Sequence, residues 1–166
     1  MSIVRVCRHE EFEISHMLDK YEGKCGRIHG HTYKAEITLE GRIIEDPFSN
    51  SYGMLMDFNE LKQIIKNAIP DHYYISNEEW QEGFQAELRD LMDKYEIPYK
   101  TSPTRSTVEN MVGWYAKAIQ DQLPDDVFVV EVKLYETTNS YGLWRIEDHP
   151  SHKYDEFRKE NVVYED

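Results

Sequence analysis

The sequence predicts an α+β domain in which helices cover one face of an antiparallel sheet. Residues 3–16, 28–43 and 127–137 each contain an apolar–polar alternation, which is typical of strands with one buried face. Between them, apolar residues recur at helical spacing in three segments. A short final strand is expected near residues 140–144. The order strand, strand, helix, extra helix, helix, strand, strand supports this fold class.

Length and composition limit the possible functions. A chain of 166 residues suits one domain with a single core. The net charge of −13 argues against a nucleic-acid partner, since such a partner needs a basic face. Two cysteines do not make a disulfide framework, no signal peptide is visible, and no apolar run reaches the roughly 20 residues that span a bilayer. We therefore expect a cytoplasmic protein with no membrane partner.

The expected helix starts share one pattern, an Asp or Ser followed three residues later by Glu. These pairs are Asp57 with Glu60, Ser76 with Glu79, and Ser106 with Glu109. The second pair predicts a helix over residues 76–95. We expect this helix to pack on the outside of the domain, with a lid or an oligomer contact as the alternative. Residues 147–166 are polar and acid-rich, and are predicted to form a tail.

Three histidines in the first two strands form a candidate metal site. His29 and His31 are two residues apart, so in a strand their side chains share one face. His16 ends the first strand, and pairing of the two strands would bring it onto the same face. Three nitrogen ligands with a fourth position open are typical of a catalytic zinc ion. A His-x-His pair alone occurs often by chance, and single histidines are more often core or surface residues.

Two further residues attract attention because of their position. Cys25 lies between Gly23 and Gly26, which indicates a turn between the histidines and not a core strand. Glu136 shares parity with the apolar residues Val130, Val132 and Leu134 of the last long strand. A charge on the buried face is costly unless it is paired, although a glutamate at a strand end more often reaches solvent.

The sequence around Cys25 resembles a known family. Residues 24–31 read K-C-G-R-I-H-G-H, which is similar to the Cys-x3-His-Gly-His signature of the 6-pyruvoyl- and 6-carboxy-tetrahydropterin synthases. The three-residue spacer resembles the 6-carboxy branch, which acts in queuosine biosynthesis. Asp71-His72 before an aromatic residue, Ser106-Thr-Val-Glu-Asn and Tyr135-Glu-Thr also resemble family motifs, with Ser106 where proline is common. The resemblance covers residues 12–145. It also implies that the helix over residues 76–95 is an extra element, inside an insertion of about residues 76–101, because family members usually have a shorter segment there.

This resemblance implies a fold and an assembly. The fold is the tunnelling fold, or T-fold, with a four-stranded antiparallel sheet, here over residues 1–146. Family members close their sheets into a barrel by trimerising, and two trimers stack into a homohexamer with active sites at the subunit interfaces. Closure also removes the exposed sheet edges.

The resemblance also implies an activity. The reaction is the zinc-dependent conversion of 7,8-dihydroneopterin triphosphate to 6-carboxy-5,6,7,8-tetrahydropterin, with release of acetaldehyde and triphosphate, which makes the protein a lyase. The implied metal ligands are His16, His29 and His31. The implied catalytic residues are Cys25, which transfers protons, and His72 held by Asp71, contributed by a neighbouring subunit. The implied substrate-binding residues are Glu136 and Thr107 for the pterin, with Lys24 and Arg27 for the triphosphate.

Two other functions remain open on these residues. A 6-pyruvoyl-tetrahydropterin synthase would use the same groups to eliminate triphosphate without losing acetaldehyde. A non-catalytic T-fold protein would only bind zinc or a pterin, although it would have little use for Cys25, Asp71 and His72 together.

Overall fold

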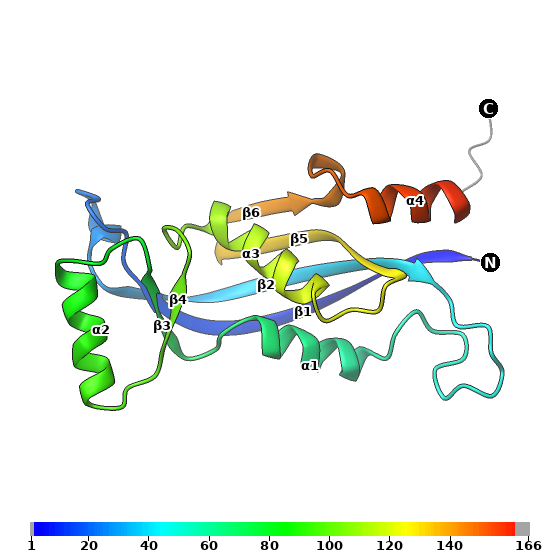
Figure 1. Ribbon diagram of the computed structural model, residues 1–166, viewed down its shortest axis with the longest axis horizontal. Helices are drawn as coiled ribbons and strands as arrows, with labels where there is room; N and C mark the ends of the chain where they lie inside the picture. Colours follow the sequence, from blue (N-terminus) through cyan, green and yellow to red (C-terminus); the bar gives the residue numbers. More distant parts are fainter. Residues whose placement is uncertain (1, 162–166) are drawn as a thin grey trace.

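The computed structural model describes residues 2–161 and contains one curled six-stranded sheet with four helices (Figure 1). The strands are β1 (Ile3–His16), β2 (His29–Arg42), β3 (Tyr73–Asn77), β4 (Tyr99–Ser102), β5 (Val127–Thr137) and β6 (Ser140–Arg145). The helices are α1 (Phe58–Ala68), α2 (Phe84–Lys94), α3 (Val108–Gln120) and α4 (His152–Asn161). Short 3-10 turns occupy Lys24–Gly26 and Ile146–Asp148. The α+β class is confirmed.

The sheet is mixed, with the strand order β4-β3-β1-β2-β5-β6. The pairs β1–β2, β2–β5 and β5–β6 are antiparallel, and these are the four strands expected from the sequence. β3 is parallel to both β1 and β4. The expectation of a four-stranded, purely antiparallel sheet is therefore wrong. The two additional strands lie at the two ends of the expected insertion, and the aromatic and β-branched run Tyr73-Tyr74-Ile75 just before it favours the first of them.

The inserted helix is shorter than the expected range of residues 76–95. Ser76 is a fully buried residue of β3, so it does not pair with Glu79 in a capping box. Helix α2 begins only after Gly83, whose φ of 83° lies in the left-handed region that glycine tolerates. The expected first turns of the helix are instead a strand and a loop, because Ser76 pairs with Thr101 of β4 and its hydroxyl bonds to Gln85 and Arg89.

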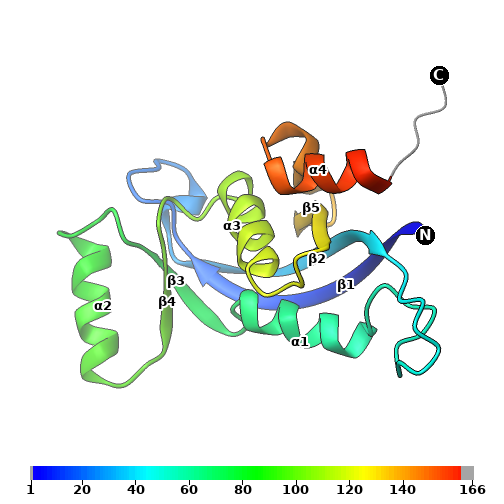
Figure 2. The same cartoon turned by 45° about the vertical axis from the view of Figure 1, so that its right-hand side comes forward.

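Helices α1 and α3 pack against one face of the sheet, as Figure 2 shows from a second angle. Asp57 caps α1, because its carboxylate accepts a hydrogen bond from the Asn59 amide at 2.6 Å. Thr107 is the N-cap residue of α3 and makes no capping bond through its side chain. The main core combines both helices with the inward residues of the three long strands. Its fully buried members include Tyr33, Ile37, Leu39, Leu61, Met111, Ile119 and Leu134.

A β-bulge in β5 changes which side chains face this core. The partner of Thr38 is Glu131 and that of Leu39 is Val129, so Val130 is the extra residue. The sequence placed Val130 on the same buried face as Val132 and Leu134. This expectation is wrong, because Val130 packs with Phe128 in a second cluster on the opposite face.

Helix α4 covers that second cluster. Tyr154 and Phe157 are buried against Phe128 with ring centroids 5.3 and 5.0 Å apart. The Tyr154 hydroxyl also donates a hydrogen bond, at 2.9 Å, to the buried carboxylate of Glu40. Arg5, at an N–O distance of 2.6 Å, and Arg158, at 3.2 Å, complete the pairing of Glu40. A buried carboxylate with several donors is far less costly than an unpaired one.

The expected acidic tail is therefore an ordered helix over much of its length, because two aromatic side chains among polar neighbours provide a buried face. Residues 162–166, also part of that expectation, lie outside the described residues. No helix within residues 2–161 is long and apolar enough to cross a bilayer.

Packing of α4 makes a testable difference to stability. Phe157→Ala should lower the free energy of unfolding by about 3 kcal/mol, because it empties a buried aromatic site. Lys159→Ala on the exposed face of the same helix should change it by less than about 0.5 kcal/mol. Urea denaturation of both variants measures the difference. Equal, small effects would mean that this segment behaves as a loose tail.

Candidate metal centre and active site

The register of β1 and β2 brings the three expected histidines together. His16 pairs directly with His29, and His31 lies two positions further along the same face, opposite Ile14. Gly30 between them leaves room for the Ile14 carbonyl oxygen, which a β-carbon at residue 30 would approach to 3.2 Å. One nitrogen from each of the three rings lies within 4.8 Å of the other two. This cluster could hold a metal ion.

The hydrogen bonds of the rings fit such a role. The Nδ1 atom of His16 lies 2.8 Å from the Ser106 carbonyl oxygen, and that of His29 lies 2.7 Å from the Arg27 carbonyl oxygen. A ring that donates from Nδ1 presents the lone pair of Nε2. The Nε2 atoms of His16 and His31 are buried and have no hydrogen-bond partner. Buried nitrogens without a partner are costly unless a further group binds them, and a metal ion would do so.

The protonation states are also suitable. Burial, with a further contribution from His29, lowers the pKa of His16 to about 4. Burial also lowers the pKa of His31. Both rings are therefore neutral at pH 7, the form that binds metal ions.

Glu136 lies beside the cluster and on the same face. Its Oε1 atom is 3.9 Å from Nε2 of His16 and 3.8 Å from Nε2 of His31. The Tyr33 hydroxyl donates a hydrogen bond to the same oxygen at 2.9 Å. Burial raises the pKa of Tyr33, and the charges of Glu136 and Cys25 add to this increase. Tyr33 was not among the site residues expected from the sequence, although its position on the same strand face as His31 was the available signal.

Cys25 lies in the exposed 3-10 turn between β1 and β2. The turn is tight, because a β-carbon at Gly26 would meet the Tyr21 carbonyl oxygen at 2.1 Å. The Cys25 carbonyl oxygen accepts a hydrogen bond from the Leu18 amide at 2.8 Å, which closes the loop at its base. Lys24 and Arg27 are exposed on either side of the thiol.

Asp71 and His72 form a pair on the surface. The His72 Nδ1 atom lies 2.8 Å from Oδ1 of Asp71, and the same oxygen accepts a hydrogen bond from the Glu13 amide at 2.9 Å. This bond from Glu13, with a smaller contribution from His72, lowers the pKa of Asp71. His72 has a φ of 62°, and its amide donates to the Glu13 carbonyl oxygen at 2.6 Å. Within residues 2–161 of one chain, no hydrogen bond or ion pair joins this pair to Cys25.

The segment before α3 contributes support that the sequence did not reveal. Ser106 was expected to cap the helix together with Glu109. Instead it is buried, and both its carbonyl oxygen and its hydroxyl, at 3.1 Å, lie within hydrogen-bond distance of His16. The next residue, Thr107, is half-buried at the start of α3. The motif therefore supports a metal-ligand candidate from a segment 90 residues away.

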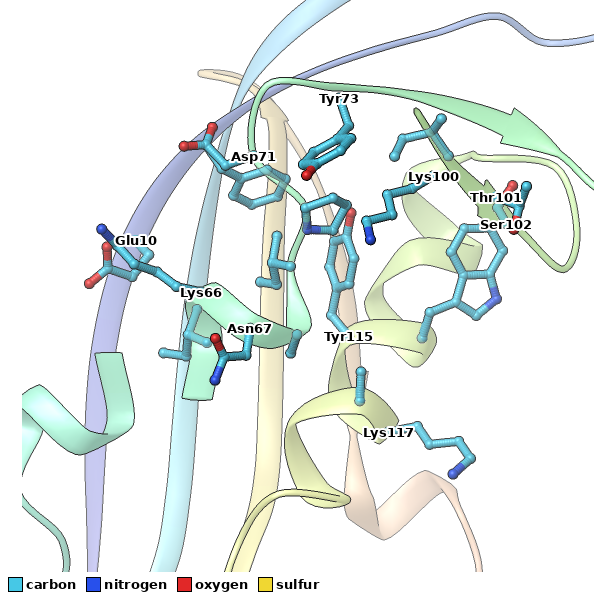
Figure 3. A pocket seen from close by; sticks show the side chains of 18 of the residues that line it. Glu10, Lys66, Asn67, Asp71, Tyr73, Lys100, Thr101, Ser102, Tyr115 and Lys117 are labelled. Atoms are coloured by element: carbon cyan, nitrogen blue, oxygen red, sulfur yellow. The ribbon is translucent and has the colours of Figure 1, made fainter. Parts of the chain in front are cut away.

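A separate cavity of about 770 Å³ lies between α1, α3 and the inserted strands. Figure 3 shows Tyr73 and Lys100 pointing into it toward Tyr115, while Lys117 points away. Asp71 lies at its rim, but none of the three histidines lines it. Because it mixes basic and acidic side chains and has no metal-ligand cluster, the histidine face remains the better candidate for chemistry.

The fold and this site define an α+β protein with a cluster of three histidines that could hold a metal ion, beside an inward carboxylate. The family model of 6-pyruvoyl tetrahydropterin synthase matches residues 5–146. The chain belongs to this family.

Relatives agree with this assignment. A protein of Pyrococcus abyssi named putative 6-carboxy-5,6,7,8-tetrahydropterin synthase is 34% identical over 141 residues, covering 80% of this chain and 84% of the relative. The 6-pyruvoyl tetrahydrobiopterin synthase of Dictyostelium discoideum is 30% identical over 152 residues, covering 86% and 96%. The structure of Caenorhabditis elegans 6-pyruvoyl tetrahydropterin synthase is similar with a TM-score of 0.59 at 22% identity, covering 87% and 96%.

Metal binding provides the direct test of the cluster. The purified protein should bind about one divalent ion per chain, and the double variant His29→Ala, His31→Ala should lose most of it. His152→Ala, which alters an exposed histidine outside the cluster, is the matched control. Metal content is measured by atomic emission after dialysis. A double variant with unchanged metal content would place the ion elsewhere.

Proposed function

We propose that the protein is a zinc-dependent 6-carboxy-5,6,7,8-tetrahydropterin synthase. It would convert 7,8-dihydroneopterin triphosphate and water to 6-carboxy-5,6,7,8-tetrahydropterin, acetaldehyde and triphosphate. The observation that carries this proposal is the position of the Glu136 carboxylate, less than 4 Å from the unpartnered ring nitrogens of His16 and His31. A pterin ring held by this carboxylate would have its side chain within reach of the same nitrogens. The product feeds queuosine biosynthesis in this interpretation.

The proposed roles follow from the chemistry of each side chain. A zinc ion on the three histidines would act as a Lewis acid toward the substrate's side-chain hydroxyls. Glu136, already ordered by Tyr33, has acceptor capacity for the amino and ring N–H donors of a pterin. Thr107 is the second pterin-binding residue. It lies at the start of α3, next to Ser106, whose carbonyl oxygen is within hydrogen-bond distance of His16.

Proton transfer is assigned to Cys25. Thiols act as bases only in the thiolate form, which a nearby base or positive charge favours. His72 is the proposed partner, oriented by Asp71 through the Nδ1 contact, so that Nε2 faces outward. Because the His72 side chain is about three-quarters exposed and no hydrogen bond or ion pair within residues 2–161 joins it to Cys25, the partner residue would come from a neighbouring subunit. Lys24 and Arg27, exposed around the thiol, would offset the triphosphate charge in an acidic protein.

Two open sheet edges support a homohexamer. β1 pairs with β3 only at Ile14 and Ser15, so most of its outer edge has no strand partner within residues 2–161. β6 pairs only with β5 in that part of the chain. Edges of this kind are stable when they are covered, and closure of three sheets into a barrel would cover both. The cytoplasm, where thiols stay reduced, is the proposed location for a protein with two free cysteines.

The second candidate is a 6-pyruvoyl-tetrahydropterin synthase, favoured by the name of the Dictyostelium relative. The two reactions share the substrate and differ in products. Release of acetaldehyde supports the first candidate, and its absence during triphosphate release supports the second.

The role of Glu136 predicts a defect in binding. Glu136→Gln should weaken pterin binding by about 1.5–3 kcal/mol, the range for hydrogen bonds to a charged group. Tyr33→Phe is the control, because it removes only the hydroxyl bonded to Glu136 and should cost less. Calorimetric titration with a pterin measures both. Equal affinity of the Glu136→Gln and wild-type proteins would remove this residue from the pterin site.

The role of Cys25 predicts a defect in turnover. Cys25→Ala should keep its zinc and its pterin affinity but lose turnover by about 10²–10⁴-fold, the range for a general acid–base group. Cys7→Ser, which changes the other exposed cysteine, should behave as wild type. Incubation with 7,8-dihydroneopterin triphosphate and mass analysis of the products test both variants. Normal turnover by Cys25→Ala would move proton transfer to another group. A wild-type protein inert toward this substrate would favour a non-catalytic pterin- or zinc-binding function.

A further inference from the structure

The inserted helix α2 lies beside the loop that carries Cys25. In Figures 1 and 2 the N-terminal end of α2 lies next to the loop between β1 and β2. Gln85, in the first turn of α2, is 1% exposed, and its Nε2 atom donates a hydrogen bond to Oδ2 of Asp19 at 2.8 Å. Asp19 belongs to that loop, three residues after His16. A buried amide bonded to a carboxylate is a strong and specific link between two segments 66 residues apart.

Both ends of the Gln85 amide are used. Its carbonyl oxygen accepts hydrogen bonds from the hydroxyls of Ser76 at 2.8 Å and Tyr74 at 3.2 Å, both on β3. Arg89, one helical turn later, donates to the Ser76 hydroxyl as well. Burial, together with the charge of Asp19, raises the pKa of Tyr74 to about 12. The amide is therefore held by the sheet on one side and holds the loop on the other.

Two more contacts fix the same part of the loop. Arg105 donates a hydrogen bond to the Asp19 carbonyl oxygen. The ammonium group of Lys20 lies 4.0 Å from the centre of the Trp80 ring, which belongs to the segment before α2. Lys20 also has a φ of 57°, a conformation that non-glycine residues keep only when their surroundings hold it.

The segment around Asp19 is hydrogen-bonded to the backbone of Cys25. Asp19 follows Leu18, whose amide donates to the Cys25 carbonyl oxygen, and the Leu18 carbonyl oxygen accepts from the Tyr21 amide at 3.2 Å. Movement of Asp19 would therefore disturb the bond that closes the Cys25 turn. The histidines, in contrast, are held by the regular pairing of β1 and β2.

We propose that the insertion positions the Cys25 loop, and that Gln85 is a positioning residue that acts through Asp19. This inference rests on the proposed role of Cys25 in proton transfer. In this proposal helix α2 affects turnover through the Cys25 loop, and other elements bind the metal ion and the pterin. Glutamine suits the position because it both accepts from two hydroxyls and donates to a carboxylate, which neither Glu nor Leu can do.

The test compares Gln85→Leu with Tyr74→Phe in the full-length, metal-loaded protein. The first variant removes the link to Asp19, and the second removes one hydroxyl from the other side of the same amide and keeps the link. In Gln85→Leu, hydrogen exchange of residues 18–27 should accelerate about tenfold or more, and kcat should fall by about as much, since a hydrogen bond to a charged group is lost. Metal content should stay at the wild-type level, and KM should change less than about threefold because the pterin anchor is untouched. Tyr74→Phe should stay within about threefold of wild type in every measurement.

Asp19 supplies an independent pair of variants that keeps the test decisive if Gln85→Leu folds poorly. Asp19→Ala should reproduce the exchange and kcat defects, whereas Asp19→Asn keeps an acceptor oxygen and should restore most of the wild-type behaviour. In a double-mutant cycle, Gln85→Leu added to Asp19→Ala should cause little further loss.

The outcomes separate this inference from the proposed function. Wild-type exchange and kcat in Gln85→Leu and Asp19→Ala would overturn the positioning role while leaving the synthase proposal intact. A wild-type protein without turnover would contradict the synthase proposal, and the exchange rates of residues 18–27 would still report on the link. Accelerated exchange together with unchanged kcat would also overturn the inference. Gln85 would then order the loop, but the order of the loop would not affect turnover.

Discussion

The antiparallel pairing of β1 with β2 is the constraint on which the rest of the structure depends. It places His16 opposite His29 and Phe12 opposite Tyr33 along one continuous face. Because side chains alternate in a strand, a slip by one residue would turn that whole face away from α1 and α3. The same register that buries the core therefore also assembles the three-histidine cluster. Core packing and site geometry therefore both depend on the register between β1 and β2.

The two faces of the sheet then serve different purposes, and the bulge at Val130 makes this possible. Without the extra residue, one face of β5 could not carry both Val129 and Val132 toward α3. The bulge leaves Phe128 and Val130 on the other face, where α4 covers them. Glu40 lies on that second face, and its carboxylate bonds to α4. The buried Glu40 carboxylate thus attaches helix α4 to the sheet.

The sequence predicted what depends on local periodicity and missed what depends on distant partners. The long strands and the shared face of the three histidines followed from alternation and are present. The Ser76–Glu79 pattern, in contrast, is a good local signal for a helix start, yet Ser76 is buried in β3 because β4 and Gln85 offer it better partners. Helix α4 was missed because only two aromatic residues mark its buried face. The support of His16 by a carbonyl group 90 residues away leaves no trace in side-chain identity.

The site residues differ in how they are held, and this difference has a consequence for the proposed chemistry. The candidate metal ligands lie on regular paired strands, so one chain brings the three histidines together by itself. Cys25 lies in a 3-10 turn, and His72 has a positive φ that costs about 1 kcal/mol or more in a non-glycine residue. That cost is offset by the hydrogen bonds of Asp71 and His72 with Glu13, which hold the pair at the surface, where no hydrogen bond or ion pair within residues 2–161 joins it to Cys25. Within the described part of an isolated subunit, this positive-φ conformation of His72 brings the Asp71–His72 pair no catalytic partner. It is explained if the pair serves the Cys25 of a neighbouring copy, in which case metal binding would require only folding and turnover would require assembly.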